Sequence, residues 1–265
     1  MKRQAFALIL CLATAFSAEA QVNTHPLFEI EAEADFICFD NLLNVYVVRN
    51  SELIKYDKNG AFQFRYSDRQ LGKIGAVDVT FPLRPLVMYP DINYAVILDN
   101  TLSNNRGRIN LLNRGIDMGT LGCTSVQNHF WFYDAMGFRL IRVNENFNRV
   151  TDTGNLAQVL RIADLQPNFL TEFANRVYLN NPTTGILVFD IFGTYIKTVP
   201  IIGLEAFQID KGEVVYFKAG KLYRYDLTNY TERGIPLPEN VLQALMQKNR
   251  IALRTAKTAE VRALN

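Results

Sequence analysis

The sequence predicts an all-β fold, a six-bladed β-propeller of four-stranded antiparallel blades whose last blade is closed by the N-terminal strand. First, a short, mostly apolar run ending in Asp or Asn recurs at intervals of about 40 residues. Second, the chain stops where the last repeat should begin another strand. Third, residues 27–32 alternate between apolar and charged side chains but correspond to no strand of the first repeat. The runs end at Asp57, Asp99, Asn144, Asp190, Asp226 and Asn265.

The first repeat shows the unit most clearly. Asn59 and Gly60 supply the left-handed conformations that a tight hairpin turn requires. After this turn, Phe62, Phe64 and Tyr66 alternate with polar residues, a period of two that is typical of a half-exposed outer strand. We therefore expect antiparallel strands at residues 35–39, 45–48, 53–56 and 62–66.

The next four repeats follow the same plan. Asp190 and Gly193, for example, repeat the spacing of the turn between Asp57 and Gly60. The expected strands are residues 77–79, 86–89, 94–98 and 108–111 in the second repeat, 123–125, 130–133, 138–143 and 148–151 in the third, 169–173, 177–180, 186–189 and 194–199 in the fourth, and 206–209, 214–217, 222–225 and 231–235 in the fifth.

The sixth repeat has expected strands only at residues 241–246, 251–254 and 261–264. A three-stranded blade would leave a bare edge, which invites aggregation. Residues 27–32 alternate as an outer strand does, so we expect them to supply the missing strand and close the ring. The alternative is that residues 239–264 form a basic amphipathic helix suited to a membrane surface or a partner.

One segment, residues 155–166, interrupts the strand pattern. We expect a short helix there, in the connection between the third and fourth repeats, that caps one end of the core. Apolar residues recur in it at helical spacing: Leu156, Val159, Leu160 and Ala163.

The N-terminus has the parts of a cleaved signal peptide. Lys2 and Arg3 supply positive charge, residues 5–16 are apolar, and Ala18-Glu19-Ala20 is a small-x-small cleavage motif. The apolar stretch is too short to span a bilayer. We expect cleavage after Ala20 and a periplasmic or secreted protein. Cys11 lacks the small preceding residue of a lipoprotein anchor, so we expect no lipid there.

A signal peptide over residues 1–20 leaves a single propeller domain over residues 21–265. Its removal takes away Lys2, Arg3 and Glu19 and lowers the net charge from +2 to +1. Such a surface has no field of one sign, which argues against binding to nucleic acid. No second apolar stretch reaches transmembrane length, so we expect no direct membrane insertion.

Two cysteines remain after cleavage, Cys38 and Cys123. They fall in the innermost strands of the first and third repeats, and a disulfide needs Cα atoms within roughly 7 Å. We therefore expect two buried thiols that act as small hydrophobes.

The first repeat contains Asn44-Val45-Tyr46-Val47 followed by Lys55-Tyr56-Asp57-Lys58-Asn59-Gly60, and weaker matches to this pattern occur at residues 176–179 and 187–193. In these residues the chain resembles the NHL-type and related six-bladed β-propellers. The resemblance implies the same ring of blades.

Two further stretches are Phe64-Arg65-Tyr66-Ser67 with Gln70-Leu71-Gly72-Lys73-Ile74, and residues 185–195. In these stretches the chain resembles, more narrowly, the small exported propellers in the cell envelopes of bacteria with type IX secretion. This resemblance implies a role like that of the plug subunit of the outer-membrane translocon.

The sequence offers few groups for catalysis. His25 lies near the N-terminus, and His129 adjoins an aromatic strand, where we expect its neighbours to satisfy it. Ser125 and His129 lack the third group and the oxyanion hole of a triad. No metal-ligand spacing or phosphate loop occurs, so we predict no enzyme and no cofactor. The Asp residues that begin the hairpins are expected to bond their own turns.

What remains is the surface, because loops on rigid scaffolds often carry function. We expect the connections from an outer strand to the next inner strand to lie on one face, and Trp131 to belong to the core. Residues 67–75 and 101–120 make that face basic and rich in amides, suited to an acidic loop of a protein partner. The candidate partner-binding residues are Arg69, Lys73, Asn104, Asn105, Arg106, Arg108 and Arg114.

The function predicted is a non-catalytic interaction module, a subunit of an envelope complex. The alternatives are a propeller enzyme of the lyase or lactonase type and a soluble ligand sensor, both using the central channel. An enzyme should gather His, Asp, Glu or a metal there, whereas a binding module can fill it with apolar side chains. The innermost strands supply Phe36, Cys38, Val77, Val79, Phe169, Leu170, Phe207 and Ile209, which favours the binding module.

Overall fold

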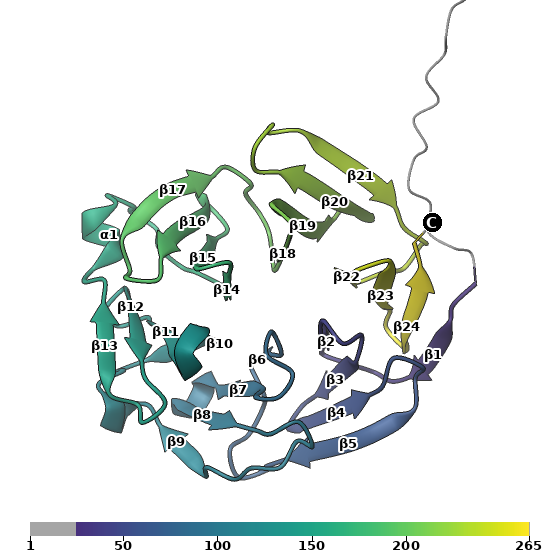
Figure 1. Ribbon diagram of the computed structural model, residues 1–265, viewed down its shortest axis with the longest axis horizontal. Helices are drawn as coiled ribbons and strands as arrows, with labels where there is room; N and C mark the ends of the chain where they lie inside the picture. The colour runs from purple at the N-terminus through teal and green to yellow at the C-terminus, as the bar shows by residue number, and fades with distance from the viewer. Residues whose placement is uncertain (1–24, 265) are drawn as a thin grey trace, which may run out of the picture.

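The computed structural model describes residues 25–264 and shows six four-stranded antiparallel sheets arranged in a ring (Figure 1). The six-bladed β-propeller predicted from the repeats is confirmed. The expected signal peptide and Asn265 lie outside the described residues.

Blades 1 to 3 add their strands from the centre outward in chain order. Blade 1 holds β2 (Phe36–Phe39), β3 (Val45–Arg49), β4 (Glu52–Tyr56) and β5 (Phe62–Ser67). Blade 2 holds β6 (Ala76–Asp78), β7 (Leu86–Tyr89), β8 (Tyr94–Ile97) and β9 (Arg108–Asn110), and blade 3 holds β10 (Gly119–Thr124), β11 (Phe130–Asp134), β12 (Arg139–Val143) and β13 (Arg149–Asp152).

Blades 4 and 5 repeat the arrangement. Blade 4 holds β14 (Phe169–Phe173), β15 (Arg176–Asn181), β16 (Gly185–Asp190) and β17 (Tyr195–Val199), and blade 5 holds β18 (Gln208–Asp210), β19 (Glu213–Lys218), β20 (Lys221–Asp226) and β21 (Glu232–Pro236). Short 3-10 turns lie in the connections of blades 2 and 3: η1 (Pro90–Ile92), η2 (Leu112–Arg114) and η3 (Val126–Asn128).

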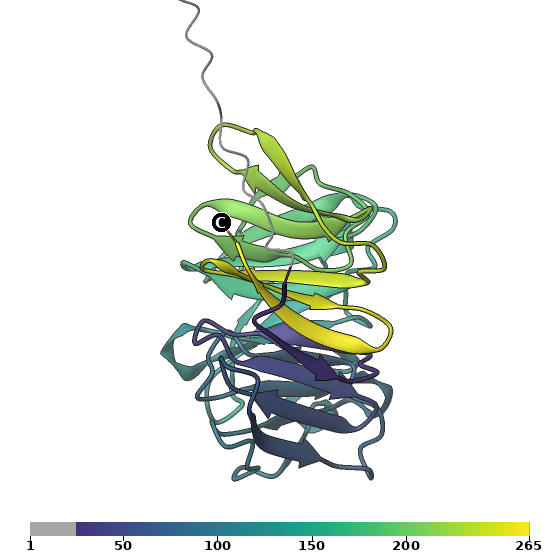
Figure 2. The ribbon, with the colours of Figure 1, turned by 90° about the vertical axis from the view of Figure 1, so that its right-hand side faces the viewer.

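Blade 6 closes the ring from both ends of the chain. Its strands are β22 (Gln243–Gln247), β23 (Arg250–Arg254), β24 (Thr258–Ala263) and, outermost, β1 (Phe28–Glu31). The purple β1 runs antiparallel beside the yellow β24, with Phe28 opposite Val261 (Figure 2). The helical alternative for residues 239–264 is wrong. Burial in β22 alternates with a period of two, which buries Ala244 and Met246 and favours the strand.

Six apolar clusters fill the six interfaces between neighbouring blades. Trp131 is fully buried between blades 3 and 4, as expected. The hairpin Asp residues bond their own turns as predicted. Asp57 Oδ1, for instance, accepts from the N–H groups of Asn59 and Ala61 at 2.8 and 2.9 Å. Each blade is therefore a rigid platform for its loops.

Two expectations need correction. The helix expected over residues 155–166 is only one turn, α1 (Leu156–Val159), because Arg161 adopts a left-handed conformation at φ 54°. Strand β10 begins at Gly119, earlier than expected, since glycines weaken the strand pattern. A Cβ at Gly122 would lie 2.8 Å from Met88 Sδ, so a larger residue there would require the Met88 side chain to move.

Cys38 and Cys123 are free thiols, as expected. Burial raises the pKa of both thiols, which keeps them protonated and unreactive. Between residues 25 and 264, no helix has the length and apolar character needed to cross a membrane.

Candidate functional site: a basic cavity on the outer rim

Carboxylates occur on the innermost strands, but they join neighbouring blades. Asp78 Oδ2 accepts from both the N–H and the Oγ1 of Thr124 at 2.6 Å, which links blades 2 and 3. Glu172 accepts from the N–H of Val126 at 3.0 Å and from Trp131 Nε1 at 2.8 Å, which links blades 3 and 4. These groups hold the ring together.

Two glutamines play the same part on the other side of the ring. Gln243 accepts from the N–H of Ile37 at 2.8 Å and donates to its carbonyl at 3.0 Å. Gln208 accepts from the N–H of Met246 at 2.6 Å. Only the apolar members of these strands were predicted from the sequence, and the polar ones were not: Asp78, Glu172, Gln208 and Gln243. Their positions in innermost strands were the available signal.

His129 differs from the expectation that its neighbours satisfy it. Its Nδ1 is buried and has no hydrogen-bond partner among the described residues. Burial lowers the pKa of the His129 imidazole, and the positive charge of Arg142 lowers it further. Both effects favour the neutral form. Ser125 Oγ accepts a hydrogen bond from Arg142 Nε at 3.1 Å. The hydroxyl of Ser125 is therefore bound by Arg142 and not by His129. Within residues 25–264, no three His, Cys, Asp or Glu side chains gather closely enough to hold a metal ion.

A cavity of about 400 Å³ lies on the outer rim, between blades 2 and 3. Strand β9 and η2 form one wall, and the turn between β12 and β13 forms the other. Three of the predicted partner-binding residues meet here. The lining comprises Arg106, Arg108, Ile109, Asn110, Asn113, Arg114, Glu145, Asn146 and Phe147.

Two of the cavity's guanidinium groups have structural partners. Arg108 forms a two-pronged ion pair with Asp68 of blade 1, through Nε at 2.8 Å and Nη2 at 2.9 Å. Arg106 Nη1 donates to the carbonyl of Glu145 at 3.1 Å, which ties the cavity's two walls together. These bonds fix the cavity's shape.

Three polar side chains of the cavity, those of Asn113, Arg114 and Asn146, have no ion-pair or hydrogen-bond partner among the described residues. Arg114 stacks over the ring of Phe147 with 5.9 Å from Cζ to the ring centroid, and it makes no ion pair with any described residue. The side-chain amides of Asn113 and Asn146 have no hydrogen-bond partner in residues 25–264 either. A guanidinium that shares a cavity with two side-chain amides suits a carboxylate and the peptide groups beside it.

Only three of the seven predicted partner-binding residues line the cavity, and the other four lie elsewhere. Arg69 is exposed and Lys73 pairs with Asp35 at 3.5 Å, both on the connection from β5 to β6, away from the cavity. Asn104 and Asn105 shape the turn between β8 and β9, by accepting from Gly107 and donating to Asp99. Successive connections of antiparallel strands alternate between the two faces, so the connections from outer to inner strands share one face, as expected. Asn104, Asn105 and Arg106 instead lie on the connection from β8 to β9, on the opposite face.

The second wall of the cavity, in the turn between β12 and β13, was not predicted from the sequence. Glu145, Asn146 and Phe147 follow Asn144, the residue that matches Asp57 in the repeat. Aligning the turns of neighbouring repeats would have placed this turn beside β9. The signal was present in the period, but the contact joins residues about 40 positions apart.

No protein-family model and no curated protein matches the chain. Among solved structures, the Pan2 WD40 domain of Neurospora crassa has 9% identity and a TM-score of 0.65, covering 90% of this chain and 95% of that one. A structure of the mitotic checkpoint complex has 9% identity and a TM-score of 0.63, covering 99% and 98%. A streptogramin B lyase has 11% identity and a TM-score of 0.59, covering 93% and 87%. At these identities the likeness shows the β-propeller fold alone.

Proposed function

We propose that this propeller is a non-catalytic interaction module that holds an acidic segment of a protein partner in the cavity between blades 2 and 3. One observation carries the proposal. Arg114, Asn113 and Asn146 line a single cavity with no partner for their side-chain polar groups in the described residues, apart from the stacking of Arg114 on Phe147. An aspartate or glutamate of the partner would supply the missing acceptor.

The inner carboxylates support a binding role over a catalytic one. Asp78 and Glu172 accept hydrogen bonds from the neighbouring blade, and those bonds would have to break before either group could act on a substrate. Propellers also occur in assemblies of proteins, as the mitotic checkpoint complex illustrates. That similarity supports a binding role by analogy of fold alone.

The more specific proposal is an exported subunit of an envelope complex, with a plug-type role in a type IX translocon. It is supported by the signal-peptide pattern of residues 1–20 and by the resemblance of the repeats to NHL-type and small exported propellers. Export is tested by fractionating cells that produce the protein and sequencing its N-terminus. A periplasmic or secreted product beginning at Gln21 is expected, and an uncleaved product in the cytoplasm would contradict export.

Affinity purification of the tagged protein from detergent-solubilised envelopes tests the binding role. Wild type should recover a defined partner, and Arg114→Glu should lose most of it because the cavity's free positive charge is reversed. Arg65→Glu is the matched control, an exposed arginine of β5 outside the cavity, and should recover as much as wild type. Recovery of an outer-membrane translocon would support the plug-type role, whereas a monomeric yield from wild type would contradict the proposal.

A further inference from the structure

A second surface, on blades 2 and 3, exposes a run of large apolar side chains. Its members are 38 to 66% exposed, although a side chain of this kind is usually buried. We call this surface the methionine arc. Its members are Ile92, Met118, Met136, Phe138 and Val159.

Hydrogen bonds hold the loops that carry the arc side by side. The side-chain Oδ1 of Asn93, beside Ile92, accepts from the N–H of Gly119 at 2.8 Å, next to Met118. The N–H of Ala135, beside Met136, donates to the carbonyl of Met118 at 2.8 Å.

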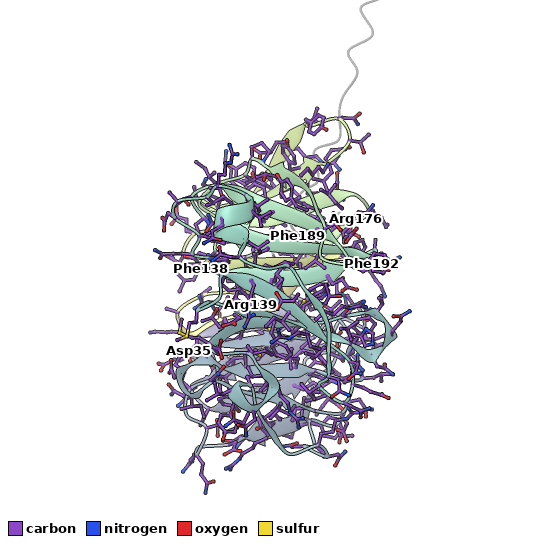
Figure 3. The ribbon with its side chains drawn as sticks, turned by 90° about the vertical axis from the view of Figure 1, so that its left-hand side faces the viewer. Asp35, Phe138, Arg139, Arg176, Phe189 and Phe192 are labelled. Atoms are coloured by element: carbon purple, nitrogen blue, oxygen red, sulfur yellow. The ribbon has the colours of Figure 1, made fainter. Side chains whose placement is uncertain are left out.

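The same kind of bond extends the arc to the connection after blade 3. The N–H of Leu156 in α1 donates to the carbonyl of Phe138 at 2.8 Å, which brings Val159 to the arc's far end. Phe138 lies on the same side of the ring as Asp35, and Phe192 lies on the opposite side (Figure 3). The arc therefore belongs to one face of the ring.

The charges around the arc are mainly negative. Arg139 lies among three carboxylates, Asp134 at 3.0 Å, Asp152 at 3.2 Å and Asp117 at 3.6 Å, and Asp152 also pairs with Arg149. Asp117 directly precedes Met118, and its side chain is 46% exposed.

Further carboxylates lie at both ends of the arc. Asp91, next to Ile92, and Asp164, on the connection that follows Val159, are exposed and form no ion pair within the described chain. Arg161 is the basic residue at the α1 end, and Arg114, on the same connection as Met118, turns to the rim cavity. The arc with its surroundings therefore has more negative than positive charge.

We propose that the methionine arc docks an amphipathic, basic segment of a protein partner. Apolar side chains of the partner would cover the exposed methionines, and its Lys or Arg residues would face Asp91 and Asp117. Methionine side chains adapt their shape to such a partner. The excess of carboxylates disfavours an anionic lipid surface at the same place. This surface and its partner's charge both differ from those of the rim cavity.

Methionine-methyl NMR tests the proposal directly, with the full-length protein labelled at methionine. The probe is a synthetic helical peptide with leucine on one face and lysine on the other. Its addition should shift the methyl signals of Met118 and Met136 and leave those of Met88 and Met246 unchanged, since the latter two are buried in the core. A matched peptide with glutamate in place of lysine should bind about tenfold more weakly or worse.

Substitutions identify the surface. Met136→Gln with Phe138→Asn should raise the Kd of the lysine peptide about tenfold, because most of the apolar contact is lost. Phe138 has a left-handed backbone at φ 51°, which asparagine tolerates, so the variant should remain folded. Phe192→Gln removes an aromatic that is 73% exposed on the opposite face and should leave the Kd unchanged.

Three outcomes would overturn the proposal. One is the absence of any shift at Met118 and Met136 at millimolar peptide. Another is equal binding of the glutamate peptide. The third is a folded Met136→Gln, Phe138→Asn variant that binds the lysine peptide as tightly as wild type.

Discussion

The interfaces on the two sides of the ring are joined by different means. Four of them contain a basic side chain that reaches across to the next blade and donates to the carbonyl of the residue just after a hairpin Asp or Asn. The bonds run from Lys55 to Asn100, from Arg106 to Glu145, from Arg142 to Ile191 and from Arg250 to Lys58.

The interface between blades 4 and 5 uses apolar contact instead. Val188 holds the place that Lys55 and Arg142 hold in their blades, two residues before the hairpin Asp or Asn. It is buried among aromatic side chains, where Phe207 meets Phe169 edge-on at 5.0 Å between ring centroids. No basic side chain is needed to fill that place.

This comparison explains why the cavity lies between blades 2 and 3. There the equivalent position is Ile97, which is buried, and the bond to the next turn comes from Arg106 on the longer connection between β8 and β9. Moving the basic group from a strand to a loop brings it out to the rim. The interface stays joined, and an opening lined by arginines and amides is left beside it.

The largest effect on stability is expected from placing a charged side chain in the apolar interface between blades 4 and 5. Val188→Lys should lower the free energy of unfolding by about 3–5 kcal/mol, because a buried charge would be left without a partner. Urea denaturation measures it. Ile196→Lys, at an exposed position of β17, should change the value by about 0.5 kcal/mol or less. A loss below about 1 kcal/mol for Val188→Lys would show that a basic group fits here too.

The next largest effect is expected from removing a buried basic group. Arg142→Met should cost about 3 kcal/mol in free energy of unfolding, because the carbonyls of Val126 and Ile191 and the hydroxyl of Ser125 each lose a donor. Denaturation of Arg176→Met is the comparison. Arg176 donates only to the adjacent Asn175 carbonyl, and its loss should be nearly neutral. Equal costs for the two variants would contradict a joining role for Arg142.

A smaller cost is expected for Lys55→Met, about 1–2 kcal/mol in free energy of unfolding. The carbonyl of Asn100 loses its donor at 2.9 Å, but the methionine can keep contact with the rings of Tyr46 and Phe64. The pKa of Lys55 is lowered by burial, so replacing the charge also removes a desolvation cost. Thermal unfolding of the two proteins at equal concentration checks this, and a gain in stability would show that burial outweighs the bond.

The smallest effect concerns pH and the interface of Arg142. Folding lowers the pKa of His129 below its ordinary 6.5, so below that pH the unfolded chain binds a proton that the folded chain excludes. Stability should therefore fall as the pH drops below about 6.5 and recover as it rises. His129→Phe should flatten this part of the profile in denaturation series at pH 5 to 8. An unchanged dependence of stability on pH in this variant would mean that the pKa of His129 is the same in the folded and unfolded chains.

The local pattern of the sequence predicted most of the fold and only part of the site. Apolar alternation and the hairpin Asp residues place nearly all the strands, because both signals act within a few residues. The pairing of Arg142 with the carbonyl of Ile191 depends on how two blades meet, and no short pattern encodes it. Likewise, Gly122 is typical of a break in a strand, and no short pattern shows that it packs against the side chain of Met88.

The central claim, that the partner sits between blades 2 and 3, is tested most directly by photo-crosslinking in cells. A photoreactive amino acid is placed at Asn146 in the cavity and, in a second protein, at Asn59, the exposed matching position in the turn of blade 1. The account predicts a discrete protein adduct from position 146 and none from position 59. Adducts from both positions alike, or from neither, would contradict it.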